Sequence, residues 1–189
     1  MTPSTIEIET TADDHRLAKL AALAIGLAIA EAVVPSPVPG VKPGLANIVT
    51  LLVWARYGWR DALWVSLLRV VASSLLLGSF LTPGFALSLT GALASLAALG
   101  LTSRLPQRYF GMVTHSVVGA FAHSGGQLTL AYLWLIPHHG LAYLIPLFAS
   151  AALLFGCVNG LIAMRLAEVE RSHAHLPAVA AGDPQQQSC

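Results

Sequence analysis

Long apolar segments, separated by short polar ones, run through most of the chain. A segment of about 20 apolar residues is long enough to cross the hydrocarbon core of a bilayer as a helix. The pattern therefore predicts an all-α polytopic membrane protein with six transmembrane helices, of which the second is short for a span. The predicted helices are Leu17–Val34, Gly44–Tyr57, Asp61–Gly78, Gly84–Leu101, Met112–Ile136 and Leu141–Leu166.

Polar segments flank this helical region. Residues 1–14 hold four acidic residues and no lysine or arginine, which is the wrong charge for the start of a signal peptide. We expect residues 1–16 to form a polar cytoplasmic tail and residues 17–166 to form the transmembrane domain. Residues 167–189, with Pro184 and three glutamines, predict a disordered cytoplasmic tail.

Basic residues indicate the orientation of the helices, because short cytoplasmic loops are enriched in lysine and arginine. In a six-helix arrangement one side of the membrane receives eight of them: Arg16, Lys19, Arg56, Arg60, Arg104, Arg108, Arg165 and Arg171. The connections on the other side hold only Lys42. Both termini are therefore predicted to be cytoplasmic, in a multi-pass protein of the inner (plasma) membrane. Aromatic residues gather at both predicted boundaries, as a membrane belt requires: Trp54, Tyr57, Trp59, Trp64, Trp134 and Tyr143.

Composition agrees with a membrane setting. Hydrophobic residues make up 56% of the chain, charged residues 10%, and the mean hydropathy is +0.70. Soluble domains carry about 25% charged residues. The net charge of +1, with scattered basic residues, gives no indication of nucleic-acid binding. Cys157 and Cys189 form no metal-binding or disulfide pattern, and no metal or cofactor is expected.

Arg69 is the strongest candidate for a functional residue, because it lies in a segment that is otherwise almost wholly apolar. An arginine at the bilayer centre costs about 2.5–3.5 kcal/mol on insertion scales, so we expect it to face a protein interior. Polar residues at similar predicted depth complete a small-molecule site that opens outward: Glu31, Lys42, Asn47, Arg69, His123 and Gln127. A structural ion pair between Glu31 and Arg69 is the alternative.

The proline-rich segment from Pro35 to Asn47 predicts an ordered lid or re-entrant loop. Alternate prolines stiffen it, and Gly40 and Gly44 permit turns. Lys42 would then point into the site. The alternative is a plain loop with a solvated lysine.

The fifth helix carries His123 and Gln127 one turn apart, with Gly125 and Gly126 between them. Adjacent glycines permit a kink or an unwound turn, which would expose backbone groups to a ligand. In the alternative interpretation the two polar side chains tie helices together. Asn159 in the sixth helix is expected to bridge helices.

Small residues recur at intervals of four in the first helix, where Ala18, Ala22, Gly26 and Ala30 share a face. Such faces let helix backbones approach closely. We expect the strip to pack inside the chain, with docking of a partner helix as the alternative. Gly156 and Gly160 predict a second close contact.

Several blocks together resemble the Gx transporter family, which is also catalogued as heptaprenyl diphosphate synthase component I. The blocks are Glu31, Val38–Leu51, Leu68–Arg69, Leu87–Gly91 and Gly119–Gln127. The family is similar to the substrate-binding subunits of energy-coupling-factor transporters, six-helix proteins that bind a solute and use separate ATPase subunits. The resemblance therefore implies a subunit that takes up a small solute with a membrane coupling subunit and an ATPase.

The alternative that the resemblance implies is the membrane component of a polyprenyl diphosphate synthase, working with a prenyltransferase subunit. No catalytic residue is predicted in this chain, because prenyl chain elongation needs carboxylate clusters that hold Mg²⁺. The one adjacent acidic pair, Asp13 and Asp14, lies in the predicted tail. The chain also lacks the glycine-rich Walker loop that ATP hydrolysis requires.

Overall fold

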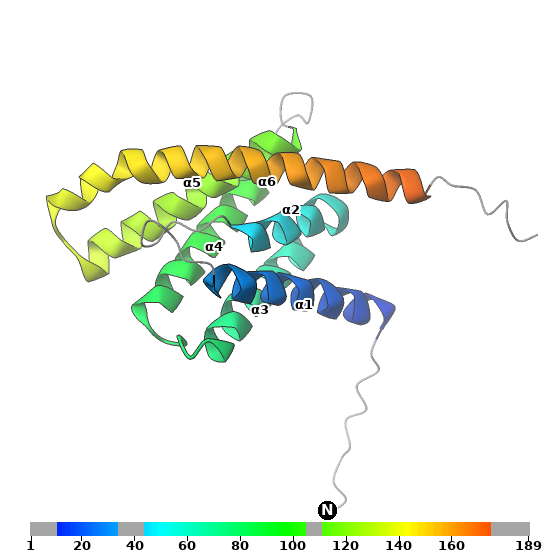
Figure 1. Cartoon of the computed structure of the whole chain (residues 1–189), viewed down its shortest axis with the longest axis horizontal. Coiled ribbons are helices and arrows are strands. Elements are labelled where there is room, and N and C mark those ends of the chain that lie inside the picture. Colours follow the sequence, from blue (N-terminus) through cyan, green and yellow to red (C-terminus); the bar gives the residue numbers. More distant parts are fainter. Residues whose placement is uncertain (1–10, 34–43, 105–110, 175–189) are drawn as a thin grey trace, which may run out of the picture.

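The computed structural model describes residues 11–33, 44–104 and 111–174, with side chains described to residue 169. Within these ranges the chain forms six α-helices and no strand, so the all-α prediction is confirmed for the described residues (Figure 1). The elements are α1 (Ala12–Val33), α2 (Leu45–Tyr57), α3 (Trp59–Leu76), α4 (Pro83–Thr102), α5 (Met112–Leu130), the π-helix η1 (Ala131–Leu135), the 3-10 helix η2 (His139–Leu144) and α6 (Ile145–Ala174).

Helix α1 begins at Ala12 rather than at the predicted Leu17, because polar residues cap its first turn. The Thr11 N–H and hydroxyl both donate to the Asp14 carboxylate, at 2.9 and 2.7 Å, and the Asp14 N–H donates to the Thr11 hydroxyl at 3.3 Å. This reciprocal arrangement satisfies N–H groups that a helix start leaves unpaired. The bonds from Thr11 also lower the pKa of Asp14 below its ordinary value.

The predicted fifth and sixth helices differ from the observed ones in the region that connects the two. Helix α5 is α-helical through Gly125 and Gly126, so the unwound turn expected there is wrong. The irregular turn lies further on, in η1. Residues 139–144, expected to start the sixth helix, form η2 instead, and α6 extends to Ala174.

The short helix α2 lies at the centre of the fold. It packs against α1, α3 and α6, and six of its 13 residues are buried. Its Val49 and Val53 join Ala24 of α1, Val65 of α3 and Leu96 of α4 in one hydrophobic cluster. On its opposite face a second cluster consists of Ile48, Leu51, Leu99 and Ala163. Helix α2 therefore belongs to the core of the protein, which explains how it can be shorter than its neighbours.

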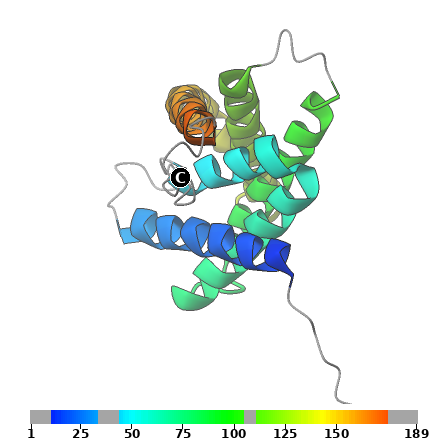
Figure 2. The same ribbon diagram turned by 90° about the vertical axis from the view of Figure 1, so that its right-hand side faces the viewer.

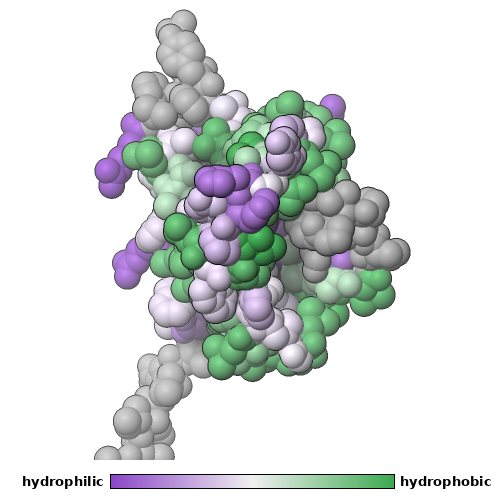
Figure 3. Space-filling view, turned by 90° about the vertical axis from the view of Figure 1, so that its left-hand side faces the viewer, coloured by the Kyte–Doolittle hydropathy of each residue, from purple (hydrophilic) through white to green (hydrophobic). Residues whose placement is uncertain are grey.

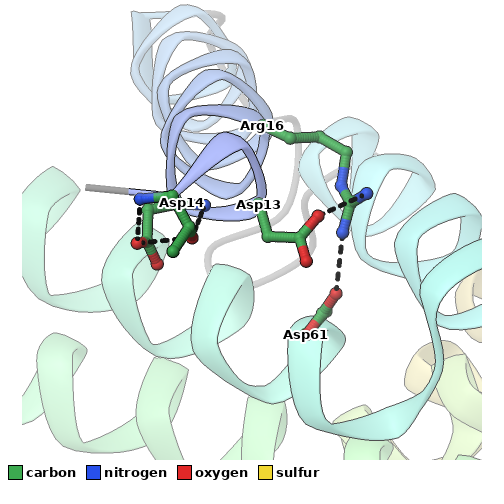
Figure 4. Close-up of polar contacts among 5 residues, drawn as sticks. Asp13, Asp14, Arg16 and Asp61 are labelled. Carbon is green, nitrogen blue, oxygen red and sulfur yellow. Dashed lines mark hydrogen bonds and ion pairs between the residues drawn. The ribbon is translucent and has the colours of Figure 1, made fainter. Parts of the chain in front are cut away.

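The start of α1, the α2–α3 turn and the end of α6 lie at one end of the molecule (Figure 1). Arg16 connects the first two of these: its guanidinium lies 3.0 Å from Asp13, 3.7 Å from Asp61 and 4.1 Å from the centre of the Tyr57 ring (Figure 4). Arg56 lies over the same ring at 5.8 Å. The structure thus groups basic residues that the charge pattern assigns to one side of the membrane.

The surface exposes many large hydrophobic side chains, among them Leu76, Leu133, Trp134, Leu154 and Leu166. Hydrophobic residues cover large areas of the face in Figure 3, interrupted by a few hydrophilic ones. Apolar surface of this extent is typical of contact with a membrane or another protein. Two segments are long and apolar enough to cross a membrane, Pro83–Thr102 and His139–Val169. By this measure two of the six predicted spans are supported.

The small-residue strip of α1 does not pack inside the described part of the chain. Ala18, Ala22, Gly26 and Ala30 are all exposed, and a Cβ atom added at Gly26 would meet nothing within 4 Å. The expectation of an intramolecular contact is therefore wrong for the described residues. Helix α1 buries a different face, which carries Ala21, Ala24 and Glu31.

The Gly156–Gly160 pair of α6 makes the close contact that its spacing predicts. A Cβ atom at these glycines would lie 2.9 Å from the Cα atom of Val117 and 2.7 Å from that of Val113, both in α5. Figure 2 shows α6 nearly end-on beside α5. Gly126 has the same role between α5 and α4, because its Cβ atom would lie 2.8 Å from the Cβ atom of Ala94.

Candidate ligand-binding site

A cavity of about 650 Å³ lies at one end of the bundle. At this end α1 ends and α2 begins, α3 is followed by α4, and η2 is followed by α6. All six α-helices contribute to its lining. Its volume falls within the range of about 300–1,000 Å³ that is usual for small-molecule sites. In the predicted orientation this end of the bundle is the outer one.

Five of the six residues expected to form a site line this cavity: Glu31, Asn47, Arg69, His123 and Gln127. They come from α1, α2, α3 and α5, so the fold brings together residues that are far apart in the sequence. The sixth, Lys42, lies outside the described residues, as does most of the proline-rich segment. The roles of these residues toward a ligand remain predictions.

Arg69 lines the cavity and is 7% exposed. One of its terminal nitrogens donates to the side-chain oxygen of Asn47 at 2.8 Å. This bond orients the guanidinium. Among the described residues that line the cavity, Arg69 is the only lysine or arginine. A charge-assisted hydrogen bond of this kind is stronger than a neutral one.

Glu31 does not form the ion pair with Arg69 that was the alternative. Its carboxylate accepts a hydrogen bond from the backbone N–H of Gly44, and among the described residues no ion pair joins it to Arg69. The two side chains still interact electrostatically across the cavity. Both charges therefore line the cavity without direct contact with each other.

Gly44 organises the start of α2 beside these charges. Its φ of 74° lies in the left-handed region that glycine adopts without strain. Its N–H donates to Glu31, and its carbonyl accepts from the backbone N–H of Asn47 at 2.8 Å and from the side chain of Asn159 at 3.3 Å. The expected turn at Gly44 is confirmed, as is the expected bridge between helices by Asn159.

His123 and Gln127 reach the cavity beside Gly91 of α4. A Cβ atom at Gly91 would lie 2.8 Å from the Nε2 and Cε1 atoms of His123 and 3.0 Å from Cγ of Gln127. The Nδ1 atom of His123 is buried and has no hydrogen-bond partner among the described residues. A buried polar atom of this kind usually has a partner, so His123 is suited to hydrogen-bond a molecule in the cavity.

Replacing Gly91 with alanine is expected to displace the His123 imidazole, because the added methyl group would overlap it at 2.8 Å. In histidine-labelled protein the ¹⁵N NMR signals of His123 should shift. Gly125→Ala is the matched control, since its Cβ atom would meet nothing within 4 Å. Unchanged His123 signals in Gly91→Ala would contradict the close contact.

Several lining residues were not predicted from the sequence. Hydroxyl groups of Ser73, Ser74, Ser88 and Ser124 line the cavity, as does Asn159. Serine is common in transmembrane helices and carries no signal in a single sequence. Apolar side chains form much of the remaining wall: Leu77, Phe85, Leu87, Leu128, Leu141, Leu144, Phe148 and Phe155. The cavity lining thus combines polar groups with large apolar side chains.

The family model described as heptaprenyl diphosphate synthase component I matches residues 20–166. No curated protein and no solved structure matches the chain significantly. The matched residues include every described residue that lines the cavity and all six residues predicted for the site. The chain therefore belongs to the heptaprenyl diphosphate synthase component I family.

Proposed function

We propose that this protein is the membrane component of a heptaprenyl diphosphate synthase and that its cavity binds the isoprenoid diphosphate. The observation that carries the proposal is that Arg69, which is bonded to Asn47, lines a cavity whose lining is otherwise rich in apolar side chains. The description of the family supports the same function.

The membrane arrangement that we propose has six spans with both termini in the cytoplasm, in the plasma (inner) membrane. The exposed apolar surface and the two long apolar segments support it. So does the grouping of Arg16 and Arg56 around Tyr57, at the end opposite the cavity. The cavity then opens toward the outer half of the bilayer.

The two ends of an isoprenoid diphosphate match the two parts of the cavity. A diphosphate is anionic and accepts hydrogen bonds, which Arg69, Asn47, Gln127 and the hydroxyl groups of Ser88 and Ser124 can donate. A prenyl chain is apolar and flexible, and side chains such as Phe148 and Phe155 can shield it from water. Glu31 disfavours an anion beside it, so we place the diphosphate on the Arg69 side, away from that carboxylate.

In this proposal chain elongation belongs to a partner prenyltransferase subunit. Elongation uses carboxylate clusters that hold Mg²⁺ against diphosphates. The adjacent acidic pair of this chain, Asp13 and Asp14, lies at the exposed start of α1, where Asp14 caps the helix and Asp13 pairs with Arg16 (Figure 4). This chain therefore supplies binding, and the partner supplies the catalytic metal site.

The test is ligand binding by the purified protein in lipid nanodiscs. Farnesyl diphosphate carries both the head and a shorter form of the chain, whereas inorganic diphosphate has only the head and farnesol only the chain. We expect farnesyl diphosphate to bind more tightly than either, because it uses both parts of the cavity. Equal affinity for farnesol and farnesyl diphosphate would refute a diphosphate site at Arg69.

Uptake of a small solute is the second candidate function. It is favoured by the polar side chains of all six α-helices that line one cavity, since a water-soluble molecule needs such groups. Here the partners would be a membrane coupling subunit and an ATPase. Native mass spectrometry of the complex separates the two functions: a co-purified prenyltransferase supports the first, and a co-purified ATPase supports the second.

A further inference from the structure

A second, smaller chamber lies directly below the cavity. It has a volume of about 40 Å³ and lies between α2, α4, α5 and α6. Asn47, Ala120 and Asn159 line both spaces, so these three residues form the partition between them. The chamber extends from this partition toward His115, which lies near the start of α5.

The chamber is lined by hydroxyl groups rather than by apolar side chains alone. Thr50, Ser95 and Ser116 face it from α2, α4 and α5. Thr50 is 6% exposed, and its hydroxyl oxygen has no hydrogen-bond partner among the described residues. Burying a hydroxyl group without a partner is energetically unfavourable, so such groups normally have one.

Thr102 shows what threonine does elsewhere in the same fold. It is also buried, but its hydroxyl donates to the carbonyl of Ala98 at 2.9 Å and lies 3.2 Å from that of Leu99. Thr50 makes no such bond to its own helix within the described residues. Its hydroxyl is therefore available to a small molecule in the chamber.

We propose that the chamber is a water-binding site, in which ordered water is bound by Thr50, Ser95 and Ser116 and connects the floor of the cavity to His115. The volume exceeds the roughly 10–15 Å³ that one buried water requires, and the polar lining offers the two to four partners that such a water needs. Arg69 donates to Asn47 in the partition, and its positive charge disfavours a metal cation so close by. Among the described residues no lysine or arginine lines the chamber, and its volume is small for a polyatomic anion, so water fits it better.

Through this water-binding site, polar groups extend from the cavity toward the opposite end of the bundle. Beyond the chamber, Nδ1 of His115 donates to the carbonyl of Gly111 at 2.9 Å, and its ring packs on Trp54 at 4.6 Å between centroids. The imidazole is thus held in place at the end of the chamber. Water between His115 and the two asparagines forms a hydrogen-bonded path that the partition separates from the ligand.

Hydroxyl-radical footprinting of the full chain in nanodiscs tests the proposal, because radicals generated from bound water oxidise side chains beside it. Leu51 and Leu99 line the chamber and are 4% and 3% exposed. Leu96, at 1% exposed, does not line the chamber and serves as the internal reference. We expect Leu51 and Leu99 to be oxidised faster than Leu96. Equal rates for all three would overturn the proposal.

Variants of Thr50 test the role of its hydroxyl group. Thr50→Val keeps the shape of the side chain and should reduce the oxidation of Leu51 and Leu99 to the rate of Leu96. Thr50→Ser should retain it. Thr102→Val is the matched control and should leave the labelling unchanged, since its hydroxyl is bonded within α4. Full labelling in Thr50→Val would rule out Thr50 as a ligand of the water.

The connection to the cavity is tested separately. Asn159→Ala shortens one side chain of the partition and should raise the oxidation of Leu51 and Leu99, because water from the cavity then enters the chamber. An unchanged rate in this variant would show that the two spaces are not connected through the partition. Neither result depends on the identity of the ligand in the cavity.

Discussion

Replacing Arg69 with glutamine is expected to weaken the binding of farnesyl diphosphate about tenfold to a hundredfold. A hydrogen bond that involves a charged group contributes about 1.5–3 kcal/mol, and each 1.4 kcal/mol changes affinity tenfold. Glutamine keeps polar atoms at this position but removes the positive charge. The diphosphate would then share the cavity with the Glu31 carboxylate, and no other lysine or arginine among the described residues lines that cavity. Calorimetric titration in nanodiscs measures the change.

Two further variants separate charge from structure. Arg69→Lys keeps the charge but loses the planar fork that binds two oxygens at once, so we expect it to bind with intermediate affinity. Arg165→Gln removes an exposed charge of α6 that lies outside the cavity, and it should bind as the wild type does. If Arg69→Gln retains full affinity while folding normally, the anion site must lie elsewhere.

Replacing Gly160 with alanine is expected to destabilise the protein by about 1–3 kcal/mol, the usual cost of forcing extra atoms into a packed interior. The added Cβ atom would lie 2.7 Å from the Cα atom of Val113, which is backbone and cannot rotate away. Helices α5 and α6 would therefore have to separate. Thermal unfolding in detergent should show the lowered midpoint.

Gly26→Ala is the matched control for this variant. Both glycines lie inside helices, where alanine is favoured over glycine by about 0.8–1.0 kcal/mol. At Gly26 the new Cβ atom would meet nothing within 4 Å, so we expect the midpoint to stay the same or to rise. Equal midpoints for Gly160→Ala and the wild type would contradict the close packing of α5 on α6.

The sequence was sufficient to predict the helices and five of the residues that line the cavity. Apolar length determines where helices form, and the cost of placing a charge such as Arg69 in an apolar segment indicates an interior position. The helix ends were less accurate where local hydrogen bonds decide them. The start of α1 depends on the contact between Thr11 and Asp14, which extends the helix into a polar segment.

The contacts between helices could not be predicted, because they depend on how each helix is rotated. The spacing of Ala18, Ala22, Gly26 and Ala30 is suited to close packing, yet α1 turns this face outward. Gly91 carries no signal of its own, although its missing side chain gives His123 room. An ion pair between Glu31 and Arg69 was the alternative to a ligand site, but the carboxylate of Glu31 accepts a hydrogen bond from the N–H of Gly44 instead.

The lengths of α4 and α6 have a consequence for the membrane around the protein. At 1.5 Å per residue, the 20 residues of α4 rise about 30 Å, and so does α6 between Ile145 and Arg165. In the proposed six-span arrangement each helix is long enough for a hydrocarbon core of about 30 Å. A thinner bilayer would favour greater tilt of these helices. Because both line the cavity, bilayer thickness would then alter the shape of the binding site.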